Sequence, residues 1–184
     1  MRLRKPVTLG VLLSIFAIAA YLAINQGRPS ISLDPTNPCE RAKKVLEEGT
    51  ISILKDADKV EVFRIDGRSD GERTNEPGNR IHGYLVKHKG KDQGREFAQD
   101  LAGILFHERT YSNGYAACFF PGIVFRPWAG EKSVTVVLCL ECDQLLVNFS
   151  RTISFYNSPL RANLVRLAKQ AFPEDPEIQE LRGP

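Results

Sequence analysis

The chain begins with a long, uncharged and mostly apolar stretch. Residues 7–24 read VTLGVLLSIFAIAAYLAI, and Arg2, Arg4 and Lys5 precede them. As a helix, this stretch would be about 27 Å long, close to the roughly 30 Å of a bilayer's hydrocarbon core. Basic residues before such a helix favour a cytoplasmic N-terminus. The pattern therefore predicts a single-pass signal anchor over residues 1–27, with the rest of the chain on the extracytoplasmic side of the cell membrane.

A cleaved signal peptide is the alternative. Ala17-Ile18-Ala19 fits the small-residue rule for cleavage, and a cut near Ala19 would release a secreted or periplasmic protein. The sequence stays apolar through Ile24, however, which is an unusual start for a mature soluble chain. This continuation favours the uncleaved anchor.

Three segments follow the anchor. Residues 28–37 are polar and rich in proline, which is typical of an extended tether. Residues 38–175 combine helical and strand patterns, and they are predicted to form one extracytoplasmic domain. Residues 176–184 read as a frayed tail.

Helical and two-residue periodicities alternate within this domain. Helices are predicted over residues 38–49, 95–107 and 159–172, the last one capped by Ser158. Strands are predicted over residues 59–65, 81–88, 115–120, 123–128, 133–140, 144–149 and 152–156. This order predicts an α+β fold, in which about three helices cover an antiparallel sheet or meander.

The charge of the exported part argues against one class of function. Without the three basic residues before the anchor, the 25 Lys and Arg residues fall to 22, which equals the 22 Asp and Glu residues. A protein that binds nucleic acid needs a concentrated basic face. The small basic cluster of Lys87, His88, Lys89 and Lys91 is instead predicted to be a solvated hairpin tip.

Four cysteines lie in the predicted exported part: Cys39, Cys118, Cys139 and Cys142. If Ala129 and Gly130 form a tight hairpin turn, Cys118 falls opposite Glu141, between Cys139 and Cys142. An oxidising compartment then favours a structural disulfide from Cys118 to Cys139 or Cys142, with the other thiols buried or paired with Cys39.

Two other hypotheses use the same cysteines. Cys118, Cys139 and Cys142 could hold zinc, with Cys39 or His107 as the fourth ligand. The Cys139-x-x-Cys142 motif could instead exchange thiols and disulfides, although redox motifs of this kind sit at a helix N-terminus and a strand pattern follows here. Without zinc, no cofactor is predicted.

Cys118-Phe119-Phe120-Pro121, followed by VTVVLCLEC, resembles a pattern of small uncharacterised bacterial exported proteins. In that family a C-F-x-P segment precedes a strand that ends in C-F-x-C, and Leu140 stands here where that pattern has Phe. The resemblance implies a bacterial source. It also implies that Cys118, Cys139 and Cys142 form one cluster, and it implies no activity.

The chain has no nucleophile elbow, phosphate-binding loop, H-E-x-x-H motif or calcium loop. We therefore expect a membrane-tethered extracytoplasmic domain with a non-catalytic binding or structural role. Its expected partners are the membrane, through the N-terminal helix, and an envelope protein or a small ligand. Metal binding or thiol redox chemistry at the cysteine cluster is the alternative.

Overall fold

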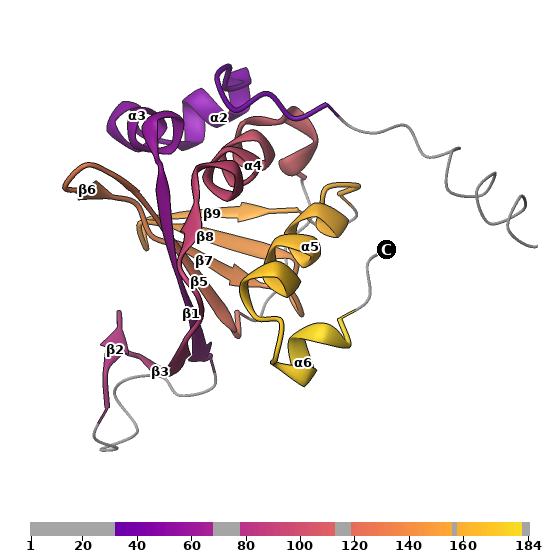
Figure 1. Cartoon of the computed structure of the whole chain (residues 1–184). Coiled ribbons are helices and arrows are strands. Elements are labelled where there is room, and N and C mark those ends of the chain that lie inside the picture. The colour runs from indigo at the N-terminus through magenta and orange to yellow at the C-terminus, as the bar shows by residue number, and fades with distance from the viewer. Residues whose placement is uncertain (1–31, 68–77, 113–118, 156–157, 182–184) are drawn as a thin grey trace, which may run out of the picture. The chain divides into compact units, whose positions relative to one another are not determined.

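Among the described residues, nine strands pair into one antiparallel sheet that curls into a half-barrel (Figure 1). The computed structural model describes residues 32–67, 78–112, 119–155 and 158–181. From Leu33 onward they belong to one compact unit. The predicted anchor over residues 1–27 lies outside the described residues. None of the described helices combines the length and apolarity needed to cross a bilayer.

The strands follow the order β2-β3-β1-β5-β7-β8-β9, and β4 pairs with β1 while β6 pairs with β5. Their bounds are β1 Lys59–Asp66, β2 Arg80–Ile81, β3 Tyr84–Lys89, β4 Gln93–Gly94, β5 Ile123–Ala129, β6 Lys132–Ser133, β7 Val136–Cys139, β8 Gln144–Val147 and β9 Arg151–Ser154.

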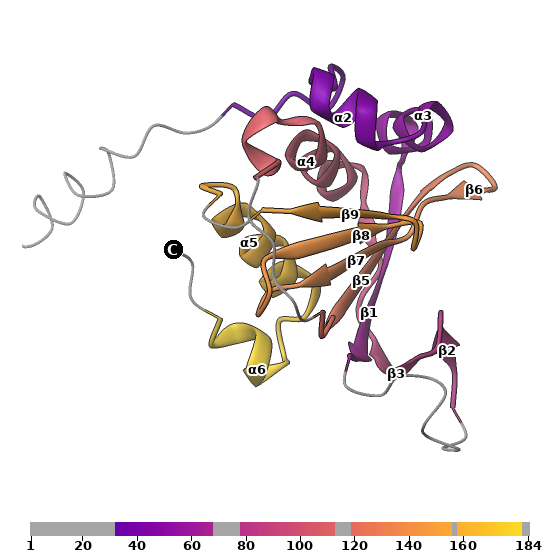
Figure 2. The same ribbon diagram turned by 180° about the vertical axis from the view of Figure 1, so that it is seen from behind.

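The described helices are α2 Glu40–Val45, α3 Glu48–Asp56, α4 Arg95–Phe106, α5 Arg161–Ala171 and α6 Pro176–Gln179, with a 3-10 turn at Glu108–Thr110. Figures 1 and 2 show α4 and α5 alongside one face of the sheet. On this face, Phe97 of α4 meets Phe125 of β5 edge to face, with ring centroids 5.4 Å apart. The prediction of an α+β domain with helices over an antiparallel sheet is therefore confirmed, although the described residues form five helices where about three were predicted.

The opposite face of the sheet carries a second apolar cluster. Its buried members are Phe63, Ile65, Ile81, Val124 and Val137. His82, at the tip of the β2–β3 hairpin, stacks on Phe149 beside the end of β8, with ring centroids 3.3 Å apart. Because β2 and β8 are far apart in the strand order, this contact shows that the sheet curls around the second cluster.

The strand predicted over residues 81–88 is interrupted by a turn. His82 and Gly83 have φ values of 49° and 86°, so they form a two-residue turn between β2 and β3. Both backbones lie in the left-handed region, which glycine adopts freely and histidine rarely. The apolar pattern continues across this turn, which is why the sequence does not reveal it.

The first helix of the domain also differs from the prediction. Two helices, α2 and α3, replace the single helix over residues 38–49. The backbone turns extended at Leu46, whose side chain is buried. Gly49 then lies in the first turn of α3 and does not end a helix.

The register of the β5–β7 hairpin differs by two positions from the prediction. Gly130 and Glu131 form the turn, since Ala129 pairs with Lys132 and Trp128 with Ser133. Gly130 supplies the positive φ of 59° that this turn requires. The predicted pairing of Cys118 with Glu141 assumed a turn at Ala129 and Gly130, and that assumption is wrong. Cys118 itself lies outside the described residues.

The C-terminal segment is more ordered than predicted. Helix α5 begins at Arg161, because Ser158 and the next two residues form a turn in which Ser158 Oγ accepts a hydrogen bond from Leu160 N at 3.1 Å. Residues 176–179, predicted to be frayed, form α6, and Ile178 is only 3% exposed. Asp175 caps this helix by accepting a hydrogen bond from Ile178 N at 3.2 Å.

Candidate functional site

A groove of about 610 Å³ lies between the end of β3 and the connection from α5 to α6. Phe172, Pro173 and Pro176 give it apolar surface, while the residues at the end of β3 give it basic side chains. Its volume falls within the range of pockets that bind small molecules or peptide side chains.

Arg64 joins the sheet to the far wall of this groove. Its Nε lies 3.2 Å from Asp175 Oδ2, and its Nη2 lies 2.6 Å from Glu177 Oε2. Its Nη1 donates to the carbonyl of Gly122 at 2.8 Å. The Arg64 side chain is only 13% exposed, so a partner for its charge is needed, and the two carboxylates provide it. Asp175 therefore both caps α6 and fixes that helix to β1.

Gly90 allows the end of β3 to approach α5. A Cβ atom at this position would lie 2.7 Å from Val62 Cγ2, 2.8 Å from the Ala171 carbonyl oxygen and 2.9 Å from Phe172 Cε1. All three separations are shorter than real Cβ contacts. Only glycine fits here without movement of the sheet or the helix, and its presence sets the width of the groove.

The basic cluster at residues 87–91 forms one wall of this groove, and it is not only a hairpin tip. The ring of His88 packs edge-on against Phe172, and its Nε2 lies 3.9 Å from Asp175 Oδ2. Lys89 is held elsewhere, by Glu61 at 3.1 Å and Asp92 at 3.0 Å. Within the described part of the chain, Lys87 and Lys91 have no ion-pair partner.

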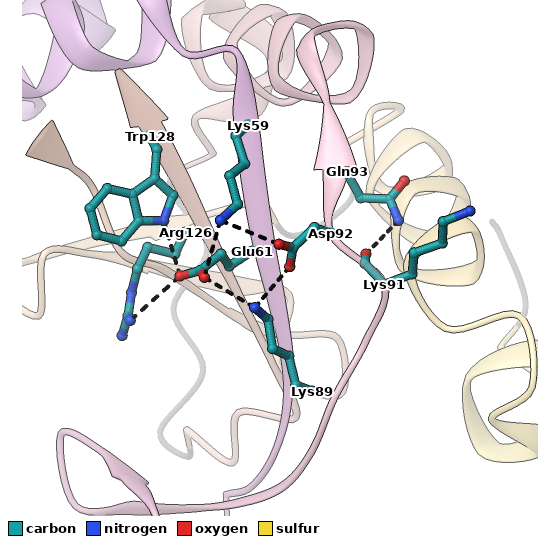
Figure 3. A network of polar contacts seen from close by, with 8 residues as sticks. All are labelled: Lys59, Glu61, Lys89, Lys91, Asp92, Gln93, Arg126 and Trp128. Carbon is teal, nitrogen blue, oxygen red and sulfur yellow. Dashed lines mark hydrogen bonds and ion pairs between the residues drawn. The ribbon is translucent and has the colours of Figure 1, made fainter. Parts of the chain in front are cut away.

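Glu61 organises the polar network that holds this wall (Figure 3). It accepts hydrogen bonds from Lys89 Nζ at 3.1 Å and Trp128 Nε1 at 3.1 Å. Lys59 Nζ lies 3.4 Å away. Burial raises the pKa of the Glu61 carboxyl, but the hydrogen bonds from Lys89 and Trp128 outweigh it, and the pKa is lowered overall. The network thus joins β1, β5 and the end of β3.

The outer edge of β3 at Lys89 lies beside the groove. Gly90 N donates to Val62 O at 2.9 Å, and His88 pairs with Arg64, so these two residues face β1. Backbone groups alternate in an antiparallel ladder, so Lys89, between them, directs its N–H and C=O away from β1. β2 pairs with Tyr84 and Leu85 of this strand, and Asn79 O, just before β2, accepts a hydrogen bond from Val86 N at 2.9 Å. Among the described residues, no strand pairs with the outer edge at Lys89.

Two smaller hollows, of about 360 and 120 Å³, adjoin the groove at Arg64 and Glu177. Phe120 lines both, and its side chain is 46% exposed.

The structure separates Cys39 from the other described cysteines. Cys39 caps α2 by accepting a hydrogen bond from Ala42 N at 3.3 Å, and burial raises the pKa of its thiol. Its own N–H donates to Phe106 O at 2.9 Å, which places it beside the end of α4. His107 caps the following 3-10 turn through a hydrogen bond from Arg109 N at 3.0 Å.

Cys139 and Cys142, by contrast, lie together in the β7–β8 turn, with sulfur atoms 2.6 Å apart. Both side chains are buried. Within the described residues, no group of three or more His, Cys, Asp and Glu side chains converges as a metal site. The proposed disulfide and zinc hypotheses both involve Cys118, which lies outside those residues.

Sequence reasoning missed the groove, because its walls come from distant parts of the chain. Arg64 and Asp175 are 111 residues apart. One local signal was present: Asp175 followed by Pro176 is the cap-and-proline start of a helix. No family model, curated protein or solved structure matches this chain.

Proposed function

We propose that the chain is a membrane-tethered extracytoplasmic domain with a non-catalytic role, and that it binds an extended segment of a partner protein. The binding site is the groove beside β3. The observation that carries this proposal is the open edge of β3 at Lys89, next to a groove that has apolar surface and two lysines without ion-pair partners among the described residues.

The chemistry of the site suits an extended peptide. A peptide strand that lies along β3 can accept a hydrogen bond from Lys89 N–H and donate one to its C=O, as in strand addition to a sheet edge. Its alternate side chains then reach the apolar surface at Phe172. Lys87 and Lys91 favour acidic side chains in the segment, whereas Glu174 is on the opposite wall.

The location is a proposal based on residues 7–24, which have the length and apolarity of a transmembrane helix. A reporter fused after Pro184 tests it. We expect an alkaline phosphatase fusion, which needs disulfides to fold, to be active, and a fluorescent fusion that folds only in the cytosol to be dark. The opposite pair of results would contradict an extracytoplasmic domain.

Binding is tested with a labelled peptide of alternating Glu and Val residues, blocked at both ends, and the full chain in detergent micelles. We expect saturable binding by fluorescence anisotropy. A peptide of alternating Lys and Val is the charge control, and it should bind at least about tenfold more weakly, since it meets Lys87 and Lys91.

Two variants at one position separate the backbone contact from the charge. Lys89→Pro removes the outward N–H, and proline is tolerated where that group faces away from the neighbouring strand. Lys89→Ala loses the same ion pairs but keeps the N–H. We expect Lys89→Pro to bind about tenfold more weakly than Lys89→Ala, which corresponds to one hydrogen bond. Equal affinities of the two variants would rule out strand addition at this edge.

A further inference from the structure

His88 is a groove residue of the one type that gains or loses its charge between pH 5 and 8. Its side chain is 50% exposed, so it can exchange a proton with the solvent. Its ring packs edge-on against Phe172, with ring centroids 5.6 Å apart. This contact holds the imidazole in the wall of the groove, where a bound segment would meet it.

The charged side chains that face His88 come from both walls of the groove. Arg64 of β1 is its partner across the ladder, and Arg64 Nε lies 3.2 Å from Asp175 Oδ2. The same Asp175 oxygen is 3.9 Å from His88 Nε2. The other charged residues that line the groove are Lys87, Lys89, Lys91, Glu174 and Glu177.

The fixed charges of the groove nearly cancel without His88. Lys89 is already paired with Glu61 at 3.1 Å and with Asp92 at 3.0 Å. Among the described residues that line the groove, three other cations face three carboxylates: Arg64, Lys87 and Lys91 against Glu174, Asp175 and Glu177. A proton on His88 therefore gives the groove a net positive charge, which attracts an anionic ligand.

We infer that protonation of His88 regulates the groove, so that an acidic segment binds more tightly at pH 5.5 than at pH 7.5. This inference rests on the proposed function of the groove. A Glu side chain of the segment at about 5 Å from a charged imidazole gains roughly threefold to fivefold in affinity, even at the dielectric constant of water. Glu side chains of a free peptide stay mostly ionised at pH 5.5.

The experiment compares the affinity of the Glu-Val peptide for the full chain in nonionic detergent micelles at the two pH values. Fluorescence anisotropy is measured with a rhodamine label, whose emission does not depend on pH in this range, and at constant ionic strength. We expect binding to be at least about threefold tighter at pH 5.5. A neutral peptide of alternating Gln and Val is the charge control and should bind equally at both pH values.

Two variants fix the charge at this position. His88→Gln stays neutral and should lose the difference between the two pH values. His88→Lys stays charged, so it should bind the Glu-Val peptide at pH 7.5 at least about threefold more tightly than His88→Gln, again without a pH response. His107→Gln is the matched control, because His107 caps the 3-10 turn after α4 and does not line the groove. It should keep the pH response of the parent.

The results distinguish this inference from the proposed function. Saturable binding with equal affinity at both pH values, or an undiminished pH response in His88→Gln, would overturn the role of His88 and leave the peptide groove standing. A lack of saturable binding at either pH would overturn the proposed function and this inference with it.

Discussion

Glu61 keeps its charge although only 17% of its side chain is exposed. It can do so because Lys89 and Trp128 donate hydrogen bonds to it, and Lys59 lies nearby. The same contacts fix Lys89, whose backbone faces the groove. The ion pair between Glu61 and Lys89 thus helps to fix the position of the Lys89 backbone, which we propose for peptide binding.

The lowered pKa of Glu61 makes stability depend on pH. A carboxyl whose pKa is depressed in the folded state stabilises the fold above its ordinary pKa of 4.5, and this contribution is lost as the pH falls through the folded value. We expect Glu61→Gln to lower the free energy of unfolding by about 1–2 kcal/mol at neutral pH. The difference from the parent should be smaller at about pH 3, because Glu61 becomes protonated, and so neutral like Gln, as the pH falls through its lowered pKa.

Urea unfolding at the two pH values measures this effect. Glu131→Gln, in the exposed β5–β6 turn, is the matched control and should change stability by less than about 0.5 kcal/mol at either pH. A loss of stability in Glu61→Gln that is the same at both pH values would show that its charge plays no part.

At the scale of elements, the long periodic segments were predicted well and the short ones were not. Strand β1 and helix α4 match their predicted bounds to within one residue, because α4 repeats its apolar residues at helical spacing and β1 is rich in Val, Phe and Ile. The β2–β3 turn depends on the left-handed backbone of two residues. Helix α6 depends on tertiary contacts such as that between Asp175 and Arg64. Such contacts leave little trace in local periodicity.

Two substitutions of glycine by alanine are expected to change stability in opposite directions, and together they test how the elements pack. Gly90→Ala places a Cβ atom within 2.9 Å of β1 and α5 atoms, and we expect it to destabilise the domain by about 1–3 kcal/mol. Gly49→Ala in α3 meets nothing within 4 Å, so its better helix propensity should stabilise by up to about 1 kcal/mol. Thermal unfolding of both variants checks the pair. A stabilising Gly90→Ala would contradict the close approach of β3 to α5.

At the scale of the whole molecule, the curl of the sheet and the docking of α6 bring distant segments together. The sequence predicts an α+β fold with an antiparallel sheet, and the structure confirms it. The groove could not be predicted, since the basic residues at its wall look like a solvated hairpin tip until α5 and α6 are placed beside them. The pattern of charged residues in the sequence does not show which part of the chain packs beside them.

The central claim is that a partner segment pairs with the open edge of β3, and amide hydrogen exchange of Lys89 tests it most directly. In the full chain, the Gly90 amide is already bonded to Val62 O and serves as the internal reference. The account predicts that the Glu-Val peptide slows exchange at Lys89 by at least about tenfold and leaves Gly90 nearly unchanged. Saturating peptide binding with unchanged exchange at Lys89 would contradict it.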